Sequence, residues 1–174
     1  HIGIGYLLGS AKKAGINAKY VDMMQQEVSM DHLLAFIDEH HPKIIGLTTW
    51  TIRINQAGHI ASKIKEKYPD ILICAGGSHA SALAKQTLEE FKGLDFIVRG
   101  EGEKILPQLF ARSDFDEIKG IVTRTNLDRG FDRIENIDDL PFPAWEEFDL
   151  AKYPGTDPHQ TNLELPMSSS RGCF

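Results

Sequence analysis

Three short runs of small and polar residues hold the side chains best suited to contact a ligand. They are Thr48-Thr49-Trp50, Gly76-Gly77-Ser78-His79 and Gly100-Glu101. Gly76-Gly77 would let the backbone approach a large ligand or expose amides to a phosphate, and would equally serve a turn that needs a positive φ. Trp50 requires a cover, which is either a planar ligand or a neighbouring helix. His79 and Glu101 could hydrogen-bond to such a ligand, and a solvent-facing loop histidine is the alternative for His79.

The two cysteines differ in their surroundings. Cys74 lies in the apolar run from Ile71 to Ala75, which predicts a small buried thiol. Cys173 follows a polar run from Ser168 to Gly172, which is not typical of the close of a folded domain. The sequence indicates no disulfide framework, so we expect a reducing, cytoplasmic environment.

The three polar runs follow short apolar segments that alternate with helical patterns. The expected strands are 18–22, 43–48, 71–75 and 95–98, and the expected helices are 30–37, 54–64, 85–91 and 102–111. This α/β alternation predicts a doubly wound parallel sheet with helices on both faces. The flavodoxin-like (Rossmann-like) strand order two-one-three-four-five suits five such units.

The first strand of the expected sheet is missing from this pattern. Residues from Ile4 to Leu8 recur with helical spacing, so the central strand should precede His1 in a longer parent protein. In open parallel sheets, ligands bind outside the carboxyl ends of the strands, near the point where the strand order reverses. We therefore expect the three runs at one edge of the sheet, together with Gly3 and Gly5 from the opening turn.

The remainder of the chain is expected to form a small β-hairpin and a linker. Residues 118–124 and 130–133 predict the two arms of the hairpin. Residues 138–145 predict an extended segment that contains two prolines and packs through its aromatic side chains on another part of the protein. The predicted division is an α/β domain over 1–112, a hairpin extension over 113–135 and an extended C-terminal linker over 136–174.

Composition and charge exclude several classes of function. A chain of 174 residues with 41% hydrophobic residues can bury a core without disulfides. The net charge of -6 argues against a general nucleic-acid surface, because phosphate binding needs clustered Lys and Arg. No apolar run approaches the roughly 18 residues that span a bilayer, and no signal-peptide pattern opens the chain. We expect neither nucleic acid nor a membrane as a partner.

Five segments stand in the order that one protein family shows. They are Gly3-Ile4-Gly5-Tyr6-Leu7, Ala75-Gly76-Gly77-Ser78-His79-Ala80, Val98-Arg99-Gly100-Glu101-Gly102-Glu103, Leu140-Pro141-Phe142-Pro143-Ala144-Trp145 and Ser170-Arg171-Gly172-Cys173. In this order the chain resembles the N-terminal cobalamin-binding domain of cobalamin-dependent radical S-adenosylmethionine (SAM) enzymes. The resemblance implies a corrin held against the strand ends. The implied cobalamin contacts are Gly3, Gly5, Thr48, Thr49, Trp50, Gly76, Gly77, Ser78, His79, Gly100 and Glu101.

The chain departs from the pattern of other cobalamin-binding proteins. Those proteins carry D-x-H-x-x-G, whose histidine ligates cobalt from below, whereas here no glycine falls three positions after His1. Their S-x-L is replaced by Thr48-Thr49-Trp50. The resemblance therefore leaves the lower cobalt ligand unassigned, and Trp50 or its loop could cover that face.

The resemblance also implies a larger parent enzyme. Cys173 would be the first cysteine of C-x-x-x-C-x-x-C, whose thiolates hold a four-iron four-sulfur (4Fe-4S) cluster in a radical SAM barrel that this chain lacks. That barrel would be the partner of this domain, and the parent would resemble a SAM-dependent methyltransferase. The fragment alone is expected to be catalytically silent. The alternative is a degenerate flavodoxin-like scaffold or docking domain that binds no cofactor and presents an apolar patch around Phe142 and Trp145.

Overall fold

The structure is a computed structural model that describes the chain except residues 24–27, 112–114, 127, 154–164, 169 and 172–174. The described residues form two compact units. One contains residues 30–133, and the other combines residues 1–29 with residues 134–174. The predicted division at residues 112 and 135 concerns domains and stays a prediction. Each unit is described by itself.

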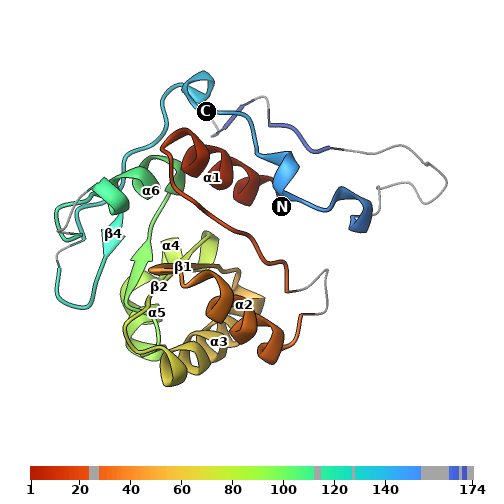
Figure 1. The fold of residues 1–174 in the computed structure, drawn as a ribbon. Helices are drawn as coiled ribbons and strands as arrows, with labels where there is room; N and C mark the ends of the chain where they lie inside the picture. Colours follow the sequence, from red (N-terminus) through yellow and green to blue (C-terminus); the bar gives the residue numbers. More distant parts are fainter. Residues whose placement is uncertain (24–27, 112–114, 127, 154–164, 169, 172–174) are drawn as a thin grey trace. The chain divides into compact units, whose positions relative to one another are not determined.

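The unit of residues 30–133 is an α/β unit built on a mostly parallel sheet (Figure 1). Strands β1 (Ile44–Thr48), β2 (Leu72–Gly76) and β3 (Phe96–Val98) are parallel, and β4 (Ile121–Val122) pairs antiparallel with β3. The spatial order β1-β2-β3-β4 agrees with the expected order of the last three parallel strands. These strands form because their apolar side chains are removed from water.

Helices cover the sheet as the apolar periodicity predicts. They are α2 (Met30–His40), α3 (Ile54–Lys67), α4 (Ser78–Ala82), α5 (Ala84–Glu90) and α6 (Gly102–Ala111). Cys74 and Phe96 share a buried cluster with Ile105 and Leu109 of α6. Ile73 is fully buried and, because side chains alternate along a strand, points to the opposite face. At β2 and β3 the sheet is thus buried on both faces, as a doubly wound fold requires.

Three expectations for this part of the chain need correction. The apolar run 43–48 predicts a buried strand, but Gly46 and Thr48 of β1 are exposed, because β1 ends the described sheet order instead of lying inside it. The short helix α4 was not expected, and it begins directly after Gly77. The expected hairpin is not formed: residues 121–122 pair with β3, and residues 128–133 contribute one backbone hydrogen bond, from Gly120 N to Gly130 O, instead of a strand.

The other unit is organised around α1 (Ile2–Lys13), the helix that the spacing of residues 4–8 predicts. Leu8 forms a buried cluster with Ala144 and Phe148. The expected strand at 18–22 is wrong, because none of these residues is in a strand. Their alternating apolar side chains pack on the aromatic cluster and not on a neighbouring strand, since Ala18 and Tyr20 both contact it.

The proline-rich segment lies against α1, as its aromatic residues predicted. A Cβ at Gly5 would lie 2.9 Å from Pro143 Cβ, and a Cβ at Gly9 would overlap the backbone oxygen of Phe142. Gly5 and Gly9 are one helical turn apart, so they open one face of α1 to the segment. Short 3-10 turns interrupt it at Ile137–Asp139, Trp145–Glu147 and Leu150–Lys152.

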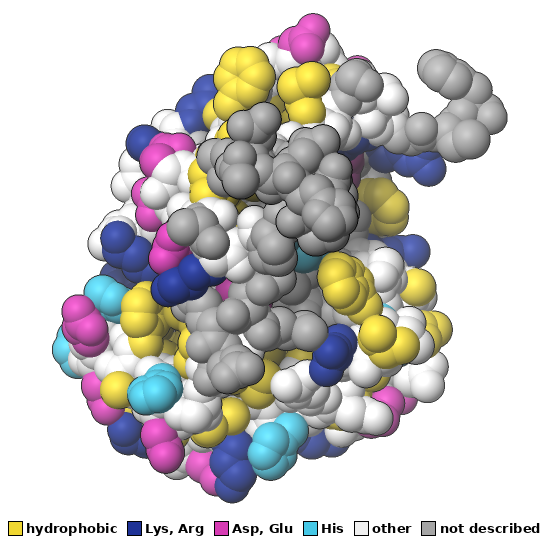
Figure 2. Space-filling view, turned by 90° about the vertical axis from the view of Figure 1, so that its right-hand side faces the viewer, with side chains coloured by type: hydrophobic (Ala, Val, Ile, Leu, Met, Phe, Trp, Pro, Cys, Tyr) yellow, Lys and Arg dark blue, Asp and Glu magenta, His cyan; other side chains and the backbone are white. Residues whose placement is uncertain are grey.

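The surface of the described residues shows two further features. No helix in this part of the chain combines the length and the apolar character needed to cross a bilayer. On the face shown in Figure 2, Lys and Arg side chains are interspersed with Asp and Glu side chains and do not gather by sign.

Candidate functional site

The carboxyl ends of β1, β2 and β3 carry the three polar runs that the sequence singles out. Thr48 and Gly76 are directly paired at the ends of β1 and β2, and Gly100 follows β3 by two residues. Because these strands are parallel and adjacent, the loops that leave them lie at the same edge of the sheet. The structure therefore places the predicted residues of this unit, from Thr48 to Glu101, in neighbouring loops.

Thr49 connects the loop after β1 to the end of β2 by hydrogen bonds. Its backbone N donates to Gly76 O at 2.7 Å, and its Oγ1 donates to the same oxygen at 2.8 Å. Thr49 is buried, so its hydroxyl is used inside the protein. The backbone N of His79 donates to Thr49 O at 3.4 Å and closes the junction from the other side.

Gly77 is required by this junction. Its φ is +99°, a left-handed conformation that favours glycine, and an added Cβ would lie 2.6 Å from Thr49 O. The structure thus confirms that a turn with positive φ accounts for Gly77. Gly76 differs, because a Cβ there would meet Val98 O at an ordinary 3.5 Å. Of the two glycines, Gly76 therefore has room for a side chain.

The exposed side chains at the ends of β1 and β2 are neutral. Thr48 and Ser78 are exposed, and the Trp50 side chain is 48% exposed, so the neighbouring helices do not fully cover it. His79 is half-buried, and its Nδ1 lies 3.2 Å from Thr51 Oγ1. This set offers hydroxyls, an imidazole and a flat apolar ring, and it suits a large ligand with neutral polar groups.

The third loop is held from two directions. Gly100 has a φ of +79°, and its backbone N donates to Ser81 Oγ of α4 at 3.1 Å. The ring of Phe131 also contacts Gly100 and occupies the space where its Cβ would lie. Glu101 is half-buried at the start of α6, and Glu103 lies in the first turn of that helix, where the dipole favours a negative charge.

Gly3 and Gly5 lie in the other unit, inside α1 and not in a loop. A Cβ at Gly3 would meet only the His1 ring, at 3.5 Å, whereas Gly5 is in contact with Pro143. The expectation that an opening turn carries these glycines is corrected, because α1 begins at Ile2. Their contact with a ligand stays a prediction.

Four residues of this edge were not singled out from the sequence. Thr51 contacts His79, and Ser81 accepts a hydrogen bond from Gly100 N. Asp128 pairs with Arg99, and Phe131 contacts Gly100. The last two lie some thirty residues beyond β3, and nothing in their spacing signals that contact.

The cysteines do not supply a metal site within the described residues. Cys74 is free and buried, and burial raises the pKa of its thiol to about 12. It is therefore a neutral thiol at neutral pH, as the apolar run predicted. Cys173 lies outside the described residues. Among the residues that are described, no group of three or more His, Cys, Asp or Glu side chains could hold a metal ion.

A family model described as "B12 binding domain" matches residues 1–110. The chain belongs to the B12-binding domain family. A B12-binding domain of flavodoxin-like architecture accounts for the parallel strands and for the position of the three loops.

Curated relatives of this B12-binding domain carry several enzyme names. An uncharacterized methyltransferase of Pyrococcus horikoshii is 26% identical over 87% of this chain and 35% of its own length. The anaerobic magnesium-protoporphyrin IX monomethyl ester cyclase of Cereibacter sphaeroides is 36% identical over 65% of this chain and 19% of its own. The cobalamin-dependent radical SAM methyltransferase TokK of Streptomyces tokunonensis is 26% identical over 48% of this chain and 13% of its own length. The matched part of this chain thus spans about a third or less of each relative.

The residues at the strand ends fit a cobalamin. A corrin is a large, nearly flat ring that carries amide side chains, so it needs apolar surface together with neutral hydrogen-bonding groups. The exposed Trp50 ring and the hydroxyls of Thr48 and Ser78 provide both. Beside them, Gly76 has no side chain, and its Cβ position would make only ordinary contacts with Val98.

Proposed function

We propose that this domain binds cobalamin at the carboxyl ends of β1, β2 and β3. The observation that carries the proposal is the gathering of Thr48, Trp50, Gly76 and Ser78 at one sheet edge in a chain of the B12-binding family. Thr49 and Gly77 act from inside the protein, because their hydrogen bond and close packing fix the two loops. His79 and Glu101 are the polar groups available to the amides of the ligand.

Bound cobalamin would supply a cobalt centre that can carry a methyl group, and the protein would bind and orient it. The residues of this chain then have three tasks: Trp50 covers part of the ring, the hydroxyls hydrogen-bond to its periphery, and Gly76, which has no side chain, lets the ring approach. Within this domain we assign no residue to the chemical step. The chain alone is therefore expected to be catalytically silent.

We further propose that the parent protein is a radical SAM enzyme, with methyl transfer as its reaction. The support is that two relatives are named as methyltransferases, of which one is a cobalamin-dependent radical SAM methyltransferase. In that parent, Cys173 would provide the first thiolate of a 4Fe-4S cluster, SAM would be a second cofactor, and the radical SAM barrel would be the partner of this domain. Another relative is named as a cyclase and not as a methyltransferase, so the reaction type of the parent protein is the first point to test.

Titration of the full-length protein with hydroxocobalamin tests the proposal. We expect corrin absorbance to co-elute with the protein on gel filtration, and Gly76→Val to weaken binding by placing a side chain where backbone meets ligand. The matched control is Gly46→Val, on the same sheet, where an added Cβ would meet only Cys74 Sγ at 3.7 Å. Protein that elutes free of corrin would contradict the proposal.

A scaffold or docking role without a cofactor is the second candidate, and one observation favours it. Phe142 is 88% exposed although its neighbours Pro143 and Ala144 are buried. Trp145, the other aromatic residue of the expected patch, instead packs against Phe148 with ring centroids 5.6 Å apart. A docking role predicts that Phe142→Ser weakens association with the barrel and that no corrin is retained.

A further inference from the structure

Backbone hydrogen bonds connect the loop that follows β4 to the residue that follows β3. We call residues 128–131 the strap. Gly120 N donates to Gly130 O at 2.8 Å, and Arg99 N donates to Gly120 O at 2.7 Å. Within the strap, Gly130 N donates to Asp128 Oδ1 at 2.9 Å and closes its turn. Backbone hydrogen bonds thus join the residue after β3, the residue before β4 and the strap.

Arg99 connects the strap to the candidate site through its side chain. Its guanidinium forms an ion pair with Asp128 and lies over the Phe131 ring, with 5.5 Å from Cζ to the centroid. The side chains of Arg99 and Asp128 are 30% and 33% exposed, so water screens this pair less than a fully exposed one. Arg99 is also the residue immediately before Gly100, where the candidate ligand turn begins.

Phe131 acts on the same turn by packing. Its ring lies against Gly100, and its Cβ lies 3.5 Å from where a Cβ of Gly120 would be. Both glycines have positive φ, +79° and +87°, so neither turn would accept a side chain without strain. Because Gly100 N also donates to Ser81 Oγ, Gly100 contacts both α4 and the strap.

The strap lies outside the residues that match the family. The match ends at residue 110, whereas the strap begins at residue 128. We propose that the strap is a positioning element of the cobalamin site: Asp128 and Phe131 hold Arg99 and Gly100, and thereby fix the turn that presents Glu101. This inference rests on the proposed function, and it adds to the site a segment that acts through Arg99 and Gly100.

The physical reason is preorganisation. A loop that is already ordered loses less conformational freedom when it binds a ligand than a loop that must be ordered by it. Loosening the strap therefore has two consequences. Cobalamin binds less tightly. The amide hydrogen of Gly100, which is donated to Ser81 Oγ, also exchanges with solvent more readily even without ligand.

The test compares two Asp→Asn variants of the full-length protein. Asp128→Asn removes the charge that holds Arg99. Asp132→Asn is the matched control, because Asp132 pairs with Lys119 at 3.1 Å between side chains that are 65% and 59% exposed. We expect Asp128→Asn to raise the dissociation constant for hydroxocobalamin about fivefold, and Asp132→Asn to leave it unchanged. Phe131→Leu, which keeps apolar volume but removes the ring from Gly100, should weaken binding in the same direction.

Hydrogen–deuterium exchange of peptides covering residues 98–103, without cobalamin, is the second readout. Faster exchange in Asp128→Asn and Phe131→Leu, but not in Asp132→Asn, supports the strap as a positioning element. Equal affinities in all variants, with binding by the wild type, overturn this inference alone. A wild type that binds no cobalamin overturns the proposed function and the inference with it.

Discussion

At the residue scale, Gly76 and Gly77 are neighbours with different structural requirements. Gly77 needs its positive φ and approaches the Thr49 backbone closely, whereas Gly76 has ordinary contacts at its Cβ position. The sequence shows two adjacent glycines and cannot separate these roles. The separation follows from the register of β1 with β2, which sets Thr49 against Gly77.

Gly77→Ala is expected to destabilise the protein by about 1–3 kcal/mol, since a side chain at this φ is strained and its Cβ would meet Thr49 O. Gly76→Ala should change the free energy of unfolding by less than about 1 kcal/mol. Urea unfolding of the two variants measures both values. Equal losses of stability would contradict the distinct roles assigned to the two glycines.

The Cys74 thiol is expected to be unreactive in the folded protein. Its pKa is raised to about 12 because burial disfavours the thiolate, so little nucleophile is present at neutral pH. Maleimide labelling followed by peptide mass spectrometry should find Cys74 unmodified until urea unfolds the protein. Rapid labelling under native conditions would show that the β2 strand opens readily.

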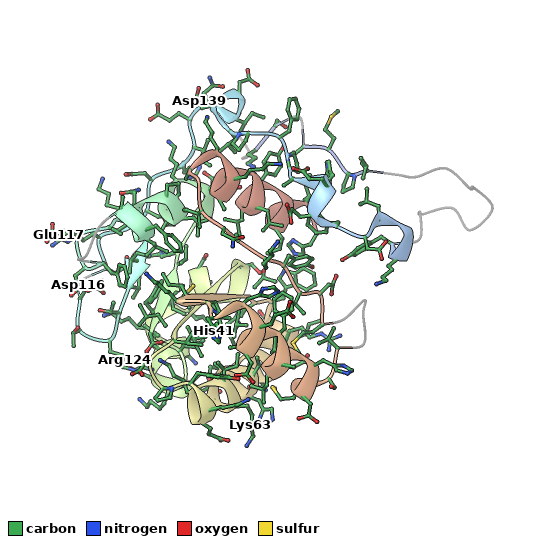
Figure 3. All side chains as sticks on the ribbon, in the orientation of Figure 1. His41, Lys63, Asp116, Glu117, Arg124 and Asp139 are labelled. Carbon is green, nitrogen blue, oxygen red and sulfur yellow. The ribbon has the colours of Figure 1, made fainter. Side chains whose placement is uncertain are left out.

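At the element scale, helix ends depend on residues far away in the sequence. Helix α5 ends at Glu90, and Arg124, labelled in Figure 3, reaches its carboxyl end. Arg124 Nη2 donates to the backbone oxygens of Leu88 at 3.0 Å and Phe91 at 3.3 Å. A cation at this end also interacts favourably with the helix dipole.

Arg124→Ala should lower the free energy of unfolding by about 1 kcal/mol, because the last carbonyl groups of α5 lose a charged donor. Arg129→Ala is the control: its pair with Glu117 lies between side chains that are 51% and 58% exposed, and such pairs contribute little. Thermal unfolding of both variants compares them. The same loss in both would mean that Arg124 acts only through general surface charge.

The segment 18–22 shows the limit of periodicity as a guide to elements. Its alternating apolar residues predict a strand, yet a strand also requires a neighbour with which to exchange backbone hydrogen bonds. Ala18 and Tyr20 instead find an aromatic cluster around Phe148. Alternation therefore identified the buried side chains correctly and assigned the wrong element.

At the scale of the whole molecule, two tyrosines link the two chain segments that make up the unit built on α1. Tyr153 donates its hydroxyl to Asp22 Oδ2 at 2.9 Å, and Tyr20 packs on Phe148 with ring centroids 5.0 Å apart. Burial, with the Asp22 carboxylate, raises the pKa of Tyr153 to about 12 and raises that of Tyr20 further. These contacts join residues near position 20 to residues near position 150.

This unit should lose stability at alkaline pH. A pKa raised in the folded state means that the tyrosines hold their protons more tightly when folded, so their contribution is complete below about pH 10 and is lost as pH rises toward about 12. The chain has two tryptophans, Trp145 in this unit and Trp50 in the other. In Trp50→Phe, Trp145 fluorescence should report the alkaline transition.

Two controls make this prediction specific. Tyr153→Phe removes the ionisable hydroxyl and should move the Trp145 transition to higher pH. In Trp145→Phe, the remaining Trp50 should change little over the same pH range. An alkaline transition that Tyr153→Phe leaves in place would show that other groups cause it.

The sequence by itself determined the local features of this domain. The spacing of apolar residues is enough to predict β1 to β3, α2, α3 and α6, because burial of one face is encoded in neighbouring positions. It also predicted the buried Cys74 and the gathering of Thr48, Gly76 and Gly100 at the carboxyl edge, since parallel strands carry their loops to one side.

Only the tertiary structure decided which partner each segment finds. Residues 121–122 pair with β3 instead of closing a hairpin, residues 18–22 pack on aromatic rings, and Asp128 reaches Arg99 across almost thirty residues. Such contacts depend on strand order and on how loops return to the sheet, and local periodicity does not encode either. For the same reason the strap was invisible in the sequence, although it holds the turn that the sequence had singled out.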